Sequence, residues 1–148
     1  MKLFLVHHAQ AVDAEVDSRR PLSTIGESHV ARLADEAAMR GARPAAVWHS
    51  GKLRARQTAQ AFWRVCNALA EFSAVPDLQP DDPPARMCTR LSGETRDVLI
   101  AGHFPHVQRL LRLLLEAPGE GTVGFPPHGV VALERDDGGA WKEIWRIV

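Results

Sequence analysis

The sequence predicts an α/β protein of three layers, in which a mostly parallel sheet is covered by helices on both faces and ends in an antiparallel hairpin. Short β-rich runs alternate with longer segments of helical periodicity through most of the chain, an order typical of parallel strands joined by crossover helices. The last residues, VVALERDDGGAWKEIWRIV, instead form two β-rich runs joined by Asp-Asp-Gly-Gly, which is a hairpin signal.

The first third of the chain predicts one strand and one helix. The strand is the apolar run Lys2–Val6, and a polar segment at 13–21 follows it. Thr24 and Glu27 have the spacing of a capping box, so we expect a helix to begin with Thr24 as its cap. Gly41 should end this helix. The apolar residues that repeat at helical spacing are Val30, Leu33, Ala34 and Ala37.

A second strand and helix follow the same order. Ala45–Trp48 is a buried apolar run, and Ser50 is expected to act as the N-cap of the next helix. A short third strand is predicted at Phe72–Val75. The inner face of the helix should be Ala55, Ala59, Phe62, Cys66 and Leu69.

The segment Asp77–Arg96 is rich in Pro, Asp and Arg, and we expect a long surface loop with one helical turn at most. Asp97–Ala101 then resumes the sheet, and a strongly amphipathic helix follows the GHFP motif. We expect a loop at 118–127, before the hairpin. The apolar face of the last helix is expected to be Val107, Leu110, Leu111, Leu114 and Leu115.

Composition places limits on the class of protein. The chain has 148 residues, 45% of them hydrophobic, which favours a single domain spanning residues 1–148. Lys plus Arg equal Asp plus Glu at 18 each, so no net charge favours nucleic acid or a membrane as partner. The first apolar run, Leu3–Val6, is too short for a signal peptide or a membrane span, and we expect a cytoplasmic protein. Cys66 and Cys88 are expected to be reduced and structural.

Three remote segments carry histidine or arginine immediately after predicted strands. His7 and His8 follow the first strand, Arg54 opens the helix after the second, and His103 follows the strand Asp97–Ala101. Ligands of such sheets bind at the carboxyl ends of the strands, so we expect these residues to meet. A neutral imidazole can attack phosphorus, while an arginine at a helix start and a second histidine can hold phosphoryl oxygens. The pattern therefore favours phosphoryl transfer through a histidine.

The chain resembles the histidine phosphatase superfamily, also called phosphoglycerate mutase-like, and within it the small SixA-type phosphohistidine phosphatases. The matching stretches are FLVHHAQA, RPLSTIGE, HSGKLRARQTA and IAGHFPHV. The resemblance implies that His8 is the nucleophile, that Arg54 binds phosphate, and that His103 is the second active-site histidine. It also implies a phosphatase without cofactor or metal that moves phosphate from a protein phosphohistidine to His8 and then to water.

The chain departs from the family at the Arg-His-Gly triplet, which reads His7, His8 and Ala9, with Gln10 at the acidic position that follows. We expect a protonated His7 to replace the missing arginine as a phosphate ligand. Because histidine offers fewer donors than arginine, two other functions remain open. One is a phosphatase of small phosphate esters, and the other is a catalytically impaired protein that binds phosphate or phosphohistidine.

Several other polar residues receive a structural interpretation. His49, His106 and His128 are expected at the surface or beside the site, and Arg56 at the surface. Zinc is not expected, because no histidine pair has the spacing of a zinc-protease helix and no cysteine cluster is present. The expected partner is a phosphorylated protein of the histidine-containing phosphotransfer type, or a small ester, and neither nucleic acid nor membrane. The general acid remains open between Asp81, Asp82, Glu94 and none.

Overall fold

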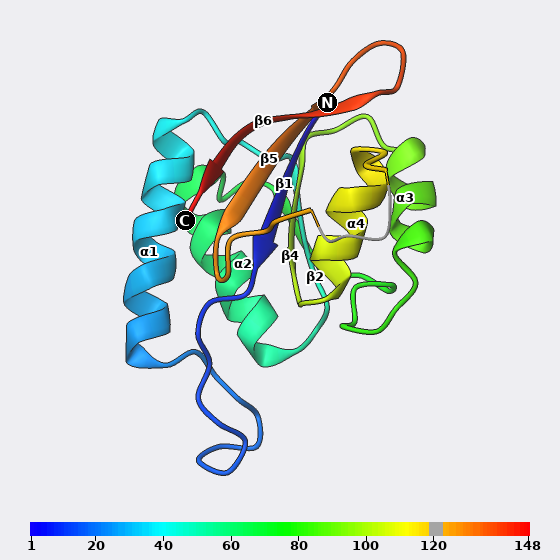
Figure 1. Ribbon diagram of the computed structural model, residues 1–148. Helices are drawn as coiled ribbons and strands as arrows, with labels where there is room; N and C mark the ends of the chain where they lie inside the picture. Colours follow the sequence, from blue (N-terminus) through cyan, green and yellow to red (C-terminus); the bar gives the residue numbers. More distant parts are fainter. Residues whose placement is uncertain (119–122) are drawn as a thin grey trace.

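The computed structural model describes residues 1–118 and 123–148 (Figure 1). A six-stranded sheet with the order β3-β2-β4-β1-β5-β6 forms its centre. Adjacent strands pair in parallel from β3 to β1, whereas β5 runs antiparallel to both β1 and β6. The predicted fold class is therefore confirmed. The strands are β1 (Lys2–His7), β2 (Ala46–His49), β3 (Glu71–Ala74), β4 (Val98–Gly102), β5 (Val130–Arg135) and β6 (Trp141–Ile147).

Two helices cover each face of the sheet (Figure 1). α1 (Thr24–Met39) and α2 (Leu53–Cys66) lie on one face, and α3 (Pro84–Ser92) and α4 (His106–Leu114) on the other. Alternate residues of β1 point to opposite faces, so Phe4 joins the core beneath α1 and α2 while Leu5 joins the core beneath α3 and α4. Within the described residues no helix is both long and apolar enough to cross a membrane.

The start of α1 differs from the prediction by one residue. Ser23, not Thr24, is the N-cap, and its Oγ accepts a hydrogen bond of 3.0 Å from the Gly26 amide. Gly26 also allows the helix to approach the loop after β1, because a Cβ there would lie 2.1 Å from the Gln10 carbonyl oxygen. The helix ends as predicted, with Gly41 in the left-handed region at φ +84° directly after the C-cap residue.

Two further predictions were wrong. The segment 77–96 contains α3, a helix of nine residues with proline in its first turn. Only Met87 and Leu91, four residues apart, are buried in α3, and one such pair was too weak a periodic signal to recognise. Leu69 does not belong to the inner face of α2, because that helix ends at Cys66 and the Leu69 side chain is 92% exposed.

The last helix and the hairpin follow the prediction. α4 buries Val107, Leu110, Leu111 and Leu114 beneath β1 and β4, and β5 and β6 form the antiparallel hairpin. Of the loop predicted at 118–127, residues 118 and 123–127 lie outside helices and strands, and 119–122 fall outside the described residues.

Candidate active site

The carboxyl ends of the parallel strands β1, β2 and β4 bring the candidate residues together. β1 ends in His7, β2 ends just before Ser50, and β4 ends just before His103. The centroids of the His8 and His103 rings are 5.2 Å apart, and those of His7 and His8 are 4.6 Å apart. Segments almost a hundred residues apart in sequence therefore form one cluster, because β1 and β4 are neighbours in the sheet.

The backbone fixes the tautomer of His8. Its Nδ1 lies 2.8 Å from the carbonyl oxygen of Ala9. A carbonyl can only accept, so Nδ1 carries the proton and Nε2 carries a lone pair. Burial lowers the pKa of His8 to about 4, which keeps this ring neutral at pH 7. The loop is tied to α2, because the Ala9 amide donates to Thr58 Oγ1 at 3.0 Å.

Ser50 contacts His103 and does not cap α2. Its Oγ lies 2.6 Å from His103 Nε2 and also accepts the amide of Lys52, the residue that precedes the helix. Ser50 Oγ and His103 Nε2 share one hydrogen, and the tautomer of the ring decides which of the two donates it. This Nδ1 is buried and has no partner among the described residues. Burial, followed by the nearby His8 and Arg54, lowers the pKa of His103 to about 3.

Arg54 lies in the first turn of α2, half-buried, and its Nε is buried without a partner among the described residues. Burial and the charge of Arg20 lower the pKa of Arg54. In residues 1–118 and 123–148 neither arginine forms a salt bridge with a carboxylate. Sequence reasoning gave Arg20 no role, although it opens the RPLSTIGE stretch. Arg56 is exposed, as expected.

His7 differs from the prediction. Its ring is 8% exposed and stacks on Phe104, with centroids 3.7 Å apart and planes at 5°. Its Nδ1 accepts a hydrogen bond of 2.8 Å from the His128 amide, so this nitrogen carries no proton. Burial, together with the nearby His8, lowers the pKa of His7 to about 3. The ring is therefore neutral in this structure, in contrast to the protonated form expected for phosphate binding, and it offers an N–H at Nε2; its role as a phosphate ligand stays a prediction.

His128 lies beside these two rings, on the loop that leads into β5. Its Nδ1 is 2.6 Å from the His8 carbonyl oxygen, and its ring stacks on that of His7 with centroids 4.8 Å apart and planes at 8°. The backbone thus occupies Nδ1 of His7, His8 and His128, and Nε2 is the atom that each ring can offer to a ligand.

One ring nitrogen from each of these three residues lies within 4.8 Å of the others, a spacing compatible with a metal ion. Two features disfavour this use. An imidazole lone pair lies in the ring plane, and the parallel planes of His7 and His128 cannot converge on one ion. The Nε2 of His7 also carries a proton. Hydrogen-bond donors and cations that have no carboxylate partner among the described residues suit an oxyanion better than a metal ion.

The remaining candidates have other partners, although Asp82 is linked to the site through Gln79, whose Nε2 donates to the Ser50 carbonyl at 2.8 Å. Asp82 Oδ2 accepts the Gln79 amide, while Asp81 is exposed. Glu94 pairs with Arg96 just before β4 begins, which places it at the opposite edge of the sheet and removes it as a general acid. His49 and His106 are buried, at 4% and 0% exposure, so a surface position was wrong for both.

Known proteins resemble the chain over nearly its whole length. The phosphohistidine phosphatase SixA of Escherichia coli strain K12 is 27% identical over 152 aligned residues, which cover 99% of this chain and 93% of that protein. A structure of the protein histidine phosphatase SixA complexed with tungstate has a TM-score of 0.85 at 27% identity and covers 99% of this chain and 96% of that one. The SixA protein of Agrobacterium tumefaciens gives 0.81 at 24% identity, over 99% and 97% of the two chains. No family model matches the chain.

Proposed function

Because the chain is a homologue of the SixA phosphohistidine phosphatases, with the fold of the histidine phosphatase superfamily, we propose that it removes phosphate from a phosphorylated histidine of a partner protein. The observation that carries this proposal is the neutral His8, whose free Nε2 lies among arginines and N–H donors that pair with no carboxylate of the described chain.

The first step transfers the phosphoryl group to His8. Its Nε2 lone pair forms the new N–P bond while the N–P bond of the substrate breaks, and the substrate imidazole takes a proton from solvent as it leaves. Because Nδ1 of His8 keeps its proton against the Ala9 carbonyl, the phosphorylated ring is cationic. In this cationic state the imidazole of His8 is a good leaving group for the second step.

In the second step water attacks phosphorus, the bond to Nε2 breaks, and His8 returns to its neutral form as phosphate departs with the oxygen of the water. Arg54 and His103 would hold the equatorial oxygens, where charge is greatest in the transition state. Arg54 Nε and His103 Nδ1 have no protein partner among the described residues. The tungstate bound to a SixA structure is likewise a tetrahedral oxyanion.

A second candidate function rests on the altered triplet. Since the neutral His7 supplies one donor where arginine would supply a charged fork, the protein could bind phosphohistidine without turning it over. Hydrolysis of a small phosphate ester is the third candidate function. Phosphate release from a panel of phosphohistidine proteins and small esters separates the three. Release from esters alone contradicts the proposal, and binding without release from either favours the binding protein.

His8→Asn provides the direct test of the nucleophile. We expect turnover to fall at least about a thousandfold, as for loss of other catalytic nucleophiles, and the acid-labile phosphoenzyme to disappear. His29→Asn is the matched control, because His29 lies on α1 and we assign it no part in the reaction. A phosphoenzyme that persists in His8→Asn would place the nucleophile elsewhere.

A further inference from the structure

The histidine that replaces the triplet arginine has a partner that the sequence does not reveal. His7 and His128 stack face to face, with centroids 4.8 Å apart and planes at 8°. In both rings Nδ1 is occupied by a backbone group. Nε2 is therefore the nitrogen that each ring has available for a ligand. The two rings lie in parallel planes beside His8, the proposed nucleophile.

Two parallel donors can bind an oxyanion in the way a guanidinium fork does. Arginine supplies several N–H groups in one plane together with a permanent positive charge. The neutral His7 supplies one N–H, at Nε2, and no charge. His128 already donates Nδ1–H to the His8 carbonyl, so protonation of its Nε2 would supply the second donor and the charge at once.

We propose that His128 binds the phosphoryl group, and that His7 and His128 together replace the arginine missing from the triplet. The assignment rests on the proposed function only for the identity of the ligand as a phosphoryl group. His128 remains partly exposed, whereas His7 is buried. The more accessible ring is thus the one that an oxyanion can reach from solvent.

Among the described residues, His128 is surrounded by other titratable bases and an arginine, none of which is paired with a carboxylate. The titratable groups that face it are His7 and His8 of β1 and His29 of α1, and Arg54 of α2 acts on the first two. In the described parts of the chain no carboxylate forms a salt bridge with any of these four residues. Within the described residues, an oxyanion beside His128 therefore meets cations and N–H donors that are not already paired with a carboxylate, which favours anion binding there.

Asparagine is the discriminating substitution at this position. His128 has φ +54°, in the left-handed region that asparagine tolerates better than most residues. The amide nitrogen of asparagine can replace Nδ1 as donor to the His8 carbonyl, and the backbone amide that binds His7 is unchanged. His128→Asn thus removes Nε2 together with the ring that stacks on His7. Arg96→Ala, at the opposite end of the parallel strands, is the control variant.

Sulfate is the appropriate probe, because it remains a dianion from pH 5 to 9 and its binding requires no turnover. We expect titration calorimetry to show sulfate binding in the parent. His128→Asn should bind about ten- to a hundredfold more weakly at pH 6, as expected for loss of one charge-assisted hydrogen bond. Arg96→Ala should match the parent. Melting temperatures check that both variants fold.

Equal sulfate affinity in the parent and His128→Asn would overturn the proposal. Phosphohistidine turnover, measured separately, keeps the two proposals distinct. A parent that turns over substrate, with His128→Asn indistinguishable in sulfate binding, contradicts the role of His128 and leaves the phosphatase function standing. The expected loss of sulfate affinity in a protein without turnover supports the role of His128 and contradicts the phosphatase.

Discussion

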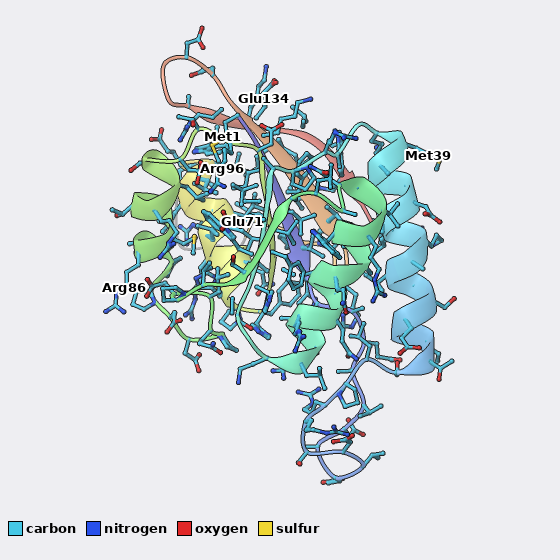
Figure 2. The ribbon with its side chains drawn as sticks, turned by 180° about the vertical axis from the view of Figure 1, so that it is seen from behind. Met1, Met39, Glu71, Arg86, Arg96 and Glu134 are labelled. Atoms are coloured by element: carbon cyan, nitrogen blue, oxygen red, sulfur yellow. The ribbon has the colours of Figure 1, made fainter. Side chains whose placement is uncertain are left out.

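The charged side chains at the two ends of the parallel strands differ in whether they are paired with other protein groups. At the amino ends, Arg96 bonds to Glu71 at 2.9 Å and to Glu94 at 3.0 Å; Arg96 and Glu71 are labelled in Figure 2. Arg135 at the same end donates to the Leu91 carbonyl at 2.8 Å. At the carboxyl ends, Arg54 keeps a buried nitrogen without a protein partner within the described chain.

This difference distinguishes groups that stabilise the fold from groups that, as we propose, bind the ligand. Hydrogen bonds from Arg96 lower the pKa of Glu94 to about 2, so the folded state favours the ionised carboxylate. Burial lowers the pKa values of His7, His8 and His103, so folding there opposes charge. The amino ends should therefore contribute to stability, and the carboxyl ends to oxyanion binding.

Arg54→Ala should give the largest contrast between activity and stability. Loss of charge-assisted hydrogen bonds to the phosphoryl group should lower kcat/KM about a hundredfold or more. The free energy of unfolding should stay level or rise, because the variant removes a partly buried cation that repels Arg20. Phosphate release and urea unfolding measure the two quantities. Turnover equal to that of the parent would exclude Arg54 from the mechanism.

Acid should destabilise the two ends in different pH ranges. His7, His8 and His103 have lowered pKa values of about 3 to 4, against an unfolded value near 6.5. As pH falls, the unfolded chain binds protons before the folded chain does. The contribution of these histidines to the free energy of unfolding is therefore complete above pH ~6.5 and is lost as pH falls, by no more than about 1.4 kcal/mol per pH unit for each histidine.

The lowered pKa values of Glu71 and Glu94 give a contribution that is lost only below pH ~4.5. Urea unfolding at pH 7, 6 and 5 should therefore report the histidines alone. His8→Asn should have a shallower loss of stability over this range, and an equal slope in parent and variant would contradict a neutral, buried His8.

Arg96→Ala should have the smallest effect. Its salt bridges are partly exposed, so the variant should lose about 0.5–1.5 kcal/mol of stability. Phosphate release should be unchanged, since Arg96 lies at the end of β4 away from the site. A fall in kcat/KM as large as that of Arg54→Ala would remove the distinction between the two ends.

The residues that sequence identified are those that follow a parallel strand. His8, Arg54 and His103 each come within a few residues of a strand end, and the rule for parallel sheets brings such positions together. His128 precedes an antiparallel strand instead. Because β5 runs against β1, the start of β5 lies at the same edge as the end of β1, and only the strand order reveals this.

Other errors arose from interactions that local patterns do not encode. Ser50 has the position of a helix cap, yet its hydroxyl contacts a histidine 53 residues away. The charge of His7 depends on burial and on an amide 121 residues away. α3 was missed because a helix of nine residues that buries one pair of side chains lacks clear periodicity. The alternation of strands and long helices, in contrast, was sufficient for the fold class.

The hydrogen bond from the His128 amide to His7 Nδ1 also bears on how the site tolerates mutation. The donor belongs to the main chain, so every residue at position 128 except proline supplies it. The tautomer of His7 is therefore protected against side-chain substitution at 128. The imidazole of His128 has no such protection. If His128 binds the anion as proposed, loss of its ring would weaken anion binding without moving the proton of its neighbour.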